Sequence, residues 1–579
     1  MSLHLVSLSL SESIRRLIPS LSEAELTILS RCRPVESRAA RSNTHWQCNA
    51  ALLLSSAQFA KYRPPSSKHF ADQVVHDLNL HRPAMVESAV VSGPGFITMT
   101  ADKSWLSQQI LSSNNIVSAT VLPREHHKKI LIDMSSPNIA KSMHVGHIRS
   151  TVIGEALANL LQAQGHKVVK INHIGDFGTQ FGILMAAIKS KCVDLDKLDI
   201  GDLEELYRYG KQTKDHSFLS QCHQYVLRLQ NGDREITALW KKIKEISRKH
   251  YEEIYRRLGI KSLIERGESF YLPYLESTVS ELLDRDIALH SQGAVCIFEE
   301  SEDFPLIIRK SDGGYTYDTT DLAALRYRFV ADKADRVIYV VDNGQAKHFE
   351  KVFSTGKKAG WIPLNAQCEF VGFGVVLGPD GKRFRTRLGN VMPLSELLDA
   401  ALQKAKEVLI ERNFQADGNS SQSIAEAIGI SAIKYADLSR QRDSNIAFDM
   451  DAMLDFRGNT SVYLQYTLCR ALKIPNDSES TSFNADNQSV QIIADDFERD
   501  LCVVILRYKD AIDDAVSRLE PHIFCQYLYS LASAMNSFYN NCPILGHERQ
   551  SVRVAILRRA VQALETGFKI LGISVIDRM

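Results

Sequence analysis

Short apolar runs alternate with longer amphipathic stretches between residues 121 and 400, and this alternation predicts an α/β domain built on a parallel sheet. The apolar run at residues 130–132 leads into a polar turn broken by Pro137, and a helix is expected over residues 144–164. A second strand is expected over residues 168–174. Later in the same domain we expect further strands of the sheet at residues 294–298, 306–310, 336–341 and 370–377. Ligands bind at the carboxyl ends of parallel strands, so the polar residues after these runs are the first candidates for a site.

Regions of different character flank and interrupt this domain. Residues 1–120 mix helical and strand-like stretches and predict a small α/β unit. Residues 179–290 are charged and have helical spacing, so we expect a solvated helical insertion with a mainly structural role. Residues 401–579 have helical spacing apart from a polar spacer at residues 476–488. The chain is therefore expected to form several domains, as its 579 residues also suggest.

The composition is that of an ordinary globular protein. Hydrophobic residues make up 44% of the chain and charged residues 24%, and the net charge is +1. Nucleic-acid binding would therefore depend on local patches and shape. The ten cysteines include no Cys-x-x-Cys pair, which argues against structural zinc and a disulfide framework and favours a reducing compartment. The sequence has no apolar run long enough for a membrane span, and we expect a cytoplasmic protein.

Two histidines three residues apart stand at the start of the helix expected over residues 144–164. Unpaired backbone N–H groups and the helix dipole favour a polyphosphate at such a terminus. Gly146 lets a base or a phosphate approach the backbone, and His144 and His147 can both donate a ring N–H to phosphate oxygens. Lys141 adds a mobile positive charge one turn earlier. This pattern predicts a nucleotide site, although two histidines in a first turn can also simply cap and solvate a helix.

The residues around the histidines make the pattern specific. Residues 135–151 read Ser-Ser-Pro-Asn-Ile-Ala-Lys-Ser-Met-His-Val-Gly-His-Ile-Arg-Ser-Thr. This run resembles the His-Ile-Gly-His signature of class I aminoacyl-tRNA synthetases, in the version carried by the arginyl-tRNA synthetases. The resemblance implies an α/β multidomain protein with a small α/β N-terminal domain that meets the outer corner of tRNA, a Rossmann-type catalytic domain with a helical insertion, and an all-α stem and anticodon-binding domain. We expect these domains at residues 1–120, 121–400 (with the insertion at about 179–290) and 401–579.

Carboxylates after the later strands suit an arginine substrate. Tyr317 and Asp321 are four residues apart and are expected on one helical face, where a hydroxyl and a carboxylate could receive a guanidinium. An acid in the first turn of a helix is also favoured by the dipole alone. Asn138 and Asn172 follow two strands and could hold the amino and carboxylate groups of an amino acid. The arginine-binding set that the resemblance implies is Ser136, Asn138, Asn172, Glu268, Tyr317, Asp321 and Gln345.

A basic loop at residues 378–390 follows the last expected strand. Its four cations within six residues could attract a pyrophosphate leaving group, although such a run in isolation is usually a solvated turn. By the resemblance, the loop takes the place of a Lys-Met-Ser-Lys-Ser motif, and Thr386 stands where the second lysine would be. The missing charge is therefore expected at Lys141. The resemblance assigns catalysis to Lys141, His144, His147, Arg385 and Arg387, and ATP binding to His144, Gly146, His147, His348 and Phe384.

The resemblance also implies aromatic contacts with tRNA. Phe96 follows a Gly-Pro-Gly turn and would stack on a D-loop base. The further candidates are Tyr463, Tyr466, Tyr539 and the final residue, Met579. For each aromatic residue, packing in a core is the alternative. Two positions depart from the family pattern, because Thr98 replaces an amide residue and Phe177 replaces a tryptophan.

The implied activity is the joining of arginine to tRNA. ATP would activate L-arginine to arginyl-adenylate, and the arginyl group would pass to the 3′-terminal adenosine of tRNA(Arg). We expect Mg²⁺ to accompany ATP, no structural zinc or other protein-bound metal, no membrane partner, and a monomer. Two alternatives remain open. One is another nucleotidyl transferase with the same signature and a small-molecule acceptor, and the other is a tRNA-binding relative that has lost catalysis.

Overall fold

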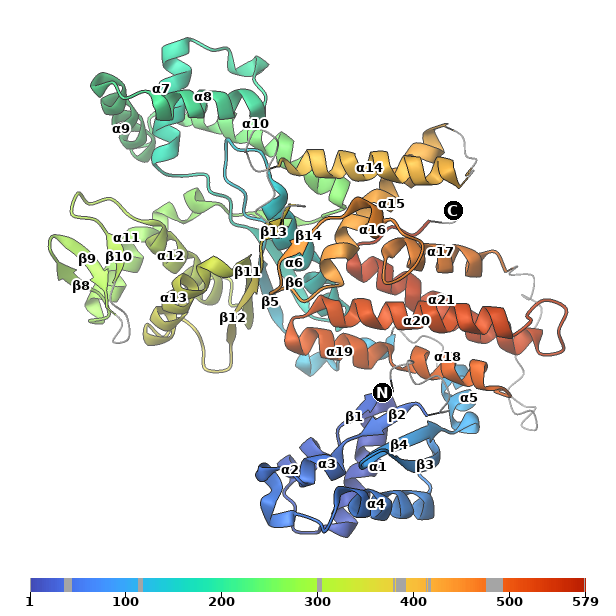
Figure 1. Cartoon of the computed structure of the whole chain (residues 1–579). Coiled ribbons are helices and arrows are strands. Elements are labelled where there is room, and N and C mark those ends of the chain that lie inside the picture. Colours follow the sequence, from blue (N-terminus) through green and yellow to red (C-terminus); the bar gives the residue numbers. More distant parts are fainter. Residues whose placement is uncertain are drawn as a thin grey trace.

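A parallel central sheet, a helical lobe, an N-terminal α/β unit and a C-terminal array of helices make up the molecule (Figure 1). The computed structural model describes residues 2–35, 44–112, 118–298, 305–378, 381, 392–412, 414, 418–474, 493–576 and 578. Within these stretches, no helix has the length and apolar content needed to cross a membrane.

The N-terminal unit is an antiparallel sheet covered by helices. Its strands, in the order β1-β2-β4-β3, are β1 (Cys32–Pro34), β2 (Trp46–Cys48), β3 (Val86–Ser92) and β4 (Phe96–Ala101). Its helices are α1 (Ser2–Leu17), α2 (Glu23–Leu29), α3 (Ala50–Leu54), α4 (Ser67–His81) and α5 (Lys103–Ser112). Trp46 and Phe59 are fully buried in its core. The α/β character expected of this region is confirmed.

A parallel sheet lies at the centre of the molecule, with the strand order β12-β11-β5-β6-β7. Its strands are β5 (Lys129–Asp133), β6 (Lys167–Asn172), β7 (Leu263–Glu265), β11 (Arg336–Asp342) and β12 (Gln367–Phe373). The helices around it include α6 (Val145–Ala163), α11 (Glu268–Asp284), α12 (Tyr317–Val330) and α13 (Ala346–Lys358). Ile130 and Ile132 of the predicted apolar run are fully buried. The predicted parallel sheet is confirmed, and the polar loops after β5, β6 and β11 meet at its carboxyl edge.

The expectation that residues 294–298 and 306–310 add to this sheet is wrong. They form β9 (Ala294–Ile297) and β10 (Leu306–Arg309), which pair antiparallel in a separate sheet with β8 (Leu289–Ser291). The physical reason is the short connection, because a parallel neighbour needs a long crossover and an antiparallel neighbour does not. The fifth parallel strand is instead β7, whose three residues are too few for a clear apolar run.

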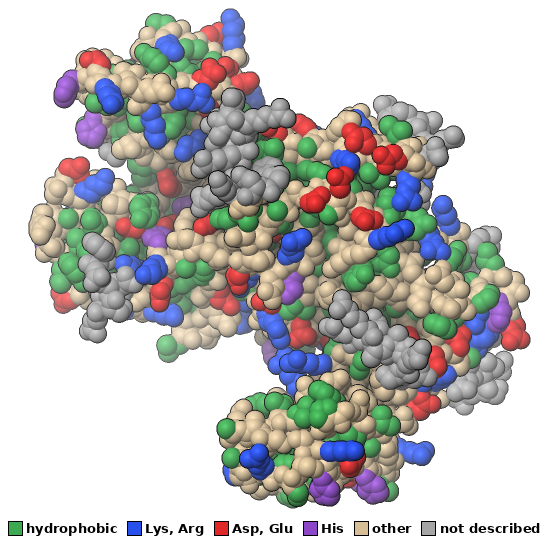
Figure 2. Space-filling view, in the orientation of Figure 1, with side chains coloured by type: hydrophobic (Ala, Val, Ile, Leu, Met, Phe, Trp, Pro, Cys, Tyr) green, Lys and Arg blue, Asp and Glu red, His purple; other side chains and the backbone are tan. Residues whose placement is uncertain are grey.

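The insertion is a helical lobe that projects from the rest of the molecule (Figures 1 and 2). Its helices are α7 (Thr179–Lys191), α8 (Ile200–Gln212), α9 (His216–Gln230) and α10 (Arg234–Leu258). Asp199, Asp215 and Asp233 cap the N-termini of α8, α9 and α10 by accepting backbone N–H groups. The predicted helical character of the insertion is confirmed, but within the expected range of 179–290 β7 belongs to the central sheet. Helix α10 runs back to the loop between β5 and α6.

The C-terminal region is an array of helices attached to the region around the central sheet. The helices are α14 (Leu394–Glu411), α15 (Gly418–Leu438), α16 (Met450–Met453), α17 (Ser461–Leu472), α18 (Asp496–Leu506), α19 (Tyr508–Arg518), α20 (Pro521–Asn541) and α21 (Gln550–Leu571). A short parallel pairing of β13 (Val376–Leu377) with β14 (Ile446–Ala447) makes one attachment. A buried ion pair makes another, because Arg149 Nη2 of α6 lies 2.9 Å from Asp437 Oδ1 of α15.

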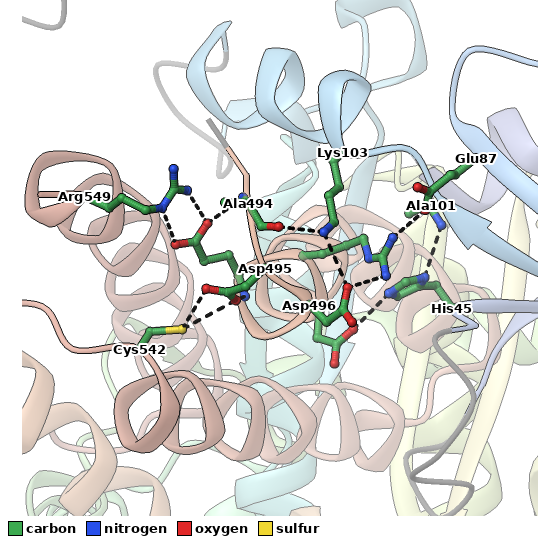
Figure 3. A network of polar contacts seen from close by, with 12 residues as sticks. His45, Glu87, Ala101, Lys103, Ala494, Asp495, Asp496, Cys542 and Arg549 are labelled. Carbon is green, nitrogen blue, oxygen red and sulfur yellow. Dashed lines mark hydrogen bonds and ion pairs between the residues drawn. The ribbon is translucent and has the colours of Figure 1, made fainter. Parts of the chain in front are cut away.

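Polar contacts join the N-terminal unit to the C-terminal helices (Figure 3). His45 Nδ1 accepts the N–H of Ala101 at 3.1 Å, so the ring proton is on Nε2, which donates to Asp500 Oδ1 at 2.9 Å. Arg499 Nη1 lies 2.5 Å from Glu87 Oε2. The two regions that flank the central sheet are therefore in direct contact with each other.

Candidate active site

The loop between β5 and α6 has a strained backbone. Ser135, Ser136 and Ala140 have φ values of 70°, 51° and 59°, in the left-handed region that non-glycine residues rarely adopt. Such residues cost about 1–3 kcal/mol each and persist where surrounding contacts hold them. The N–H of Ser136 donates to Asn172 Oδ1 at 3.0 Å, and Ser136 Oγ donates to Asp133 Oδ1 at 3.1 Å. The predicted residues Ser136 and Asn172 therefore meet at the carboxyl ends of β5 and β6.

Asn138 lies at the same edge. It forms a parallel bridge with Gly175 beyond β6, and a Cβ at Gly175 would lie 2.3 Å from Asn138 Oδ1. The missing side chain of glycine thus allows this close approach. Asn172 Nδ2 donates to Tyr255 OH at 3.1 Å. Part of the Asn172 amide therefore holds the loop itself, a role that the sequence prediction did not include.

The two signature histidines face each other at the start of α6, with ring centroids 4.0 Å apart. His144 Nδ1 accepts the N–H of Gly146 at 3.1 Å, and His147 Nδ1 accepts the N–H of His144 at 3.0 Å. Because a backbone N–H can only donate, each ring carries its proton on Nε2. Burial, followed by nearby positive charge, lowers the pKa of both histidines, and that of His147 falls to about 3. Each ring is therefore neutral at pH 7 and can donate from Nε2.

Lys141 is exposed in the loop between β5 and α6, which we call the signature loop. Its Nζ lies 5.8 Å from the ring centroid of Tyr207, which belongs to α8 of the insertion. A cavity of about 430 Å³ opens beside it, lined by Ala140, Lys141, Glu204, Tyr207, Arg208, Lys211 and Gln212. Several predicted residues lie outside the described residues: Phe384, Arg385, Thr386, Arg387 and Met579.

Glu268 is the first residue of α11, and its carboxyl group is partly buried near other acids. Burial, followed by the negative charges of Asp176 and Asp321, raises the pKa of Glu268 to about 7. Asp176 is fully buried and accepts from Lys244 Nζ at 2.6 Å and from the N–H of Ser269 at 2.8 Å. The sequence prediction missed this cluster. The run Gly-Asp-Phe-Gly at residues 175–178 contains Asp176, but Lys244 and Ser269, which contact it, lie 68 and 93 residues further along the chain.

Asp321 lies against two histidines. His348 Nε2 is 2.7 Å from Asp321 Oδ2, and His348 Nδ1 is 3.2 Å from Asp318 Oδ1. His173 Nε2, which the prediction missed, is 3.8 Å from Asp321 Oδ1. Burial acts to lower the pKa of His348, but hydrogen bonds to Asp318 and Asp321 raise it to about 9. The structure therefore brings His348, predicted to contact ATP, against an acid predicted to receive arginine.

Tyr317 and Gln345 lie on the exposed side of this cluster. The Tyr317 side chain is 66% exposed, and its ring centroid lies 5.3 Å from that of His348. Both Tyr317 and Asp321 thus adjoin His348, as expected for residues on one face of α12. Gln345 is exposed immediately before α13, the helix that carries His348.

The aromatic residues predicted to contact tRNA differ in exposure. Phe96 is partly buried at the start of β4, and Tyr463 is partly buried in α17. Tyr466 and Tyr539 are 37% and 39% exposed. The guanidinium carbon of Arg470 lies 5.8 Å and 4.4 Å from the centroids of these two rings, so a single cation joins them. Of the predicted tyrosines, Tyr466 and Tyr539 are the pair that the fold brings together at the surface.

Two family models match the chain. The model described as "tRNA synthetases class I (R), catalytic domain" matches residues 107–450, and the model described as "DALR anticodon binding domain" matches residues 464–579. The parallel sheet and its paired histidines therefore lie in the catalytic domain of a class I tRNA synthetase.

Relatives define the family within this class. An arginine–tRNA ligase of Synechococcus elongatus is 39% identical over 552 residues, which cover 92% of this chain and 93% of that protein. An arginine–tRNA ligase of Pasteurella multocida is 37% identical over 535 residues, which cover 90% and 94%. The crystal structure of arginyl-tRNA synthetase from Plasmodium falciparum is similar with a TM-score of 0.81 at 28% identity, over 100% of this chain and 99% of that one. The chain belongs to the arginyl-tRNA synthetase family.

Proposed function

We propose that the protein is an arginine–tRNA ligase. In the first step the carboxylate of L-arginine attacks the α-phosphate of ATP, which forms arginyl-adenylate and releases pyrophosphate. In the second step the 2′-hydroxyl of the terminal adenosine of tRNA(Arg) attacks the carbonyl carbon of the adenylate, and AMP leaves. The observation that carries this proposal is that one edge of the sheet holds two sets of groups. A neutral histidine pair lies at the start of α6, after β5, and the acids Glu268 and Asp321 lie near each other beside His173, after β6.

The start of α6 provides the phosphate side of the proposed site. The Nε2–H groups of His144 and His147 would donate to phosphate oxygens of ATP, and Gly146 would let the nucleotide approach the backbone. Lys141 would supply the positive charge that Thr386 does not. Such chemistry depends on positioning and charge neutralisation. The other residues proposed to act on ATP or pyrophosphate are His348, Phe384, Arg385 and Arg387.

Mg²⁺ would arrive with ATP as part of the substrate. The groups at the start of α6 are imidazole N–H donors and an ammonium, which suit phosphate oxygens, whereas Mg²⁺ requires oxygen ligands. Among the described residues, no group of three or more His, Cys, Asp or Glu side chains is arranged to hold a metal ion. We therefore assign the magnesium to the ATP phosphates.

The acids provide the arginine side of the proposed site. Asp321 would receive the guanidinium, because a carboxylate accepts two of its parallel N–H groups. Glu268 would add a second acid that ionises when the guanidinium arrives. The remaining members of the proposed arginine-binding set are Ser136, Asn138, Asn172, Tyr317 and Gln345.

The two flanking regions would bind tRNA. Residues 1–120 would meet its outer corner and residues 401–579 its anticodon, on either side of the catalytic residues 121–400. Direct contact between the flanking regions supports a fixed spacing of the two tRNA-binding surfaces. The residues proposed to contact tRNA are Phe96, Tyr463, Tyr466, Tyr539 and Met579, and the protein would act as a cytoplasmic monomer.

One assay tests this function against its alternatives. ATP–pyrophosphate exchange is measured with and without arginine, and with and without tRNA(Arg). We expect exchange that requires arginine and is increased by tRNA. Exchange that is indifferent to both would indicate a nucleotidyl transferase with another acceptor. No exchange under any condition, together with tRNA binding, would indicate a binding protein without catalysis.

A further inference from the structure

The insertion holds the loop between β5 and α6 at four backbone positions. Helices α8 and α10 supply the side chains, and the loop supplies N–H and C=O groups between Asn138 and Met143. Tyr251 OH donates to Asn138 O at 2.6 Å, Ser247 Oγ accepts the N–H of Ala140 at 3.0 Å, Glu204 Oε1 accepts the N–H of Ser142, and His250 Nε2 accepts the N–H of Met143 at 3.3 Å. These contacts join residues that are 62 to 113 positions apart in the sequence.

The loop needs such external support. Ala140 has a φ of 59°, and residues 141–143 belong to neither a helix nor a strand. A strained, non-repetitive segment keeps one geometry only where its surroundings determine it. Because the insertion contacts this segment through side chains, their positions decide where its backbone lies.

Glu204 and His250 hold the two backbone N–H groups between Lys141 and His144. The N–H of Ser142 follows Lys141 directly, and the N–H of Met143 precedes His144. A displacement of either group would therefore move the ammonium and the first imidazole of the phosphate site together.

Glu204 and His250 are both suited to accept a hydrogen bond from a backbone N–H group. Glu204 presents a carboxylate oxygen, and hydrogen bonds from a backbone N–H to a charged acceptor are stronger than neutral ones. His250 can accept from a backbone N–H only as the neutral imidazole, and burial lowers its pKa and so favours that form. Tyr207, one turn after Glu204 on α8, lies under the ammonium of Lys141. The same helix therefore holds the backbone of Ser142 and the side chain of Lys141.

We propose that Glu204 and His250 are positioning residues for the adenylation step, which hold Lys141 and His144 in place for the phosphates of ATP. This inference rests on the proposed function. It gives the insertion a role in catalysis, in contrast to the mainly structural role expected from its charged helices. Among the residues that the structure describes, Glu204 lines the cavity of about 430 Å³ that opens beside Lys141.

The test uses the full-length protein in arginine-dependent ATP–pyrophosphate exchange at saturating tRNA(Arg). Glu204→Ala removes the acceptor, Glu204→Gln keeps an acceptor oxygen without the charge, and Glu205→Ala is the matched control because Glu205 is the exposed neighbour on α8. We expect Glu204→Ala to lower kcat about 10- to 100-fold with an unchanged KM for arginine, because a misplacement of about 1 Å can cost that much. Glu204→Gln should recover most of the lost kcat, and Glu205→Ala should match the wild type.

His250→Ala tests the adjacent N–H independently, and circular dichroism melting monitors the fold of every variant. If Glu204→Ala unfolds, the other two variants test the proposal. Glu204→Gln must then have a kcat near that of the wild type, and His250→Ala must have a lowered kcat. The proposal is overturned if Glu204→Ala retains a kcat within twofold of Glu205→Ala, or if Glu204→Gln falls as far as Glu204→Ala. An inactive wild type would instead overturn the proposed function, so the two failures are distinguishable.

Discussion

Arginine binding is expected to depend on pH through Glu268. Its ordinary pKa of 4.5 is raised to about 7 by burial and by the charges of Asp176 and Asp321. A guanidinium favours the ionised carboxylate, so the pKa falls when arginine binds and a proton is released. The affinity for arginine should therefore rise as pH increases through 7 and become constant above about pH 8.

The size of the effect follows from the same pKa. With a value of about 7, roughly one tenth of Glu268 is ionised at pH 6 and roughly nine tenths at pH 8, so the affinity for arginine should increase about tenfold across this range. Without arginine, the stability of the protein has the opposite dependence on pH. A raised carboxyl pKa gives stability that is fully present below pH 4.5 and is lost as pH rises through 7, by about 3 kcal/mol at high pH.

Isothermal titration calorimetry measures this proton directly. Arginine is titrated at about pH 6, 7 and 8, each in two buffers with different ionisation enthalpies, and the difference between buffers gives the protons released. We expect close to one proton at pH 6 and close to none at pH 8. Glu268→Gln should abolish the release and, without arginine, should raise the melting temperature at pH 8.

Asp321→Asn serves as a matched control for this experiment. It removes a carboxylate from the same pocket, so it should weaken arginine binding while some proton release persists at Glu268. The reasoning would be refuted if wild-type affinity were equal at pH 6 and pH 8, or if Glu268→Gln released as many protons as the wild type.

Three further predictions concern single contacts. Lys141→Ala should lower kcat of ATP–pyrophosphate exchange by about tenfold or more and Thr386→Ala by much less; equal losses would refute the proposed shift of the catalytic charge to Lys141. His348→Asn should lower the KM for arginine about tenfold, because His348 occupies one oxygen of Asp321 at 2.7 Å and one charge-assisted hydrogen bond is worth about 1.5 kcal/mol. The KM for ATP should rise, because His348 is also proposed to contact the nucleotide, and an unchanged KM for ATP would refute that contact. Arg149→Leu leaves the fully buried Asp437 without its ion-pair partner, so chemical denaturation should show that the free energy of unfolding falls by about 3–5 kcal/mol. Arg15→Ala breaks an exposed ion pair with Glu23 and should lower the free energy of unfolding by less than about 1 kcal/mol.

The sequence by itself determined the features that neighbouring residues encode. The strand–turn–helix around the signature, the two histidines at the start of α6 and the helical character of the insertion all follow from local periodicity, glycine and capping positions. Spacing along one helix likewise placed Tyr317 and Asp321 on the same side of α12. Such features need only short-range geometry, which one stretch of chain specifies.

Only the tertiary structure decided which distant segments meet. It separated β9 and β10 from the parallel sheet and placed His348 on Asp321. It also placed Glu204 on the backbone of the signature loop, 62 residues away from Ser142. The physical reason is that these contacts depend on how whole helices pack, and a charged residue on a helix has the same local pattern whether it faces solvent or an active-site loop.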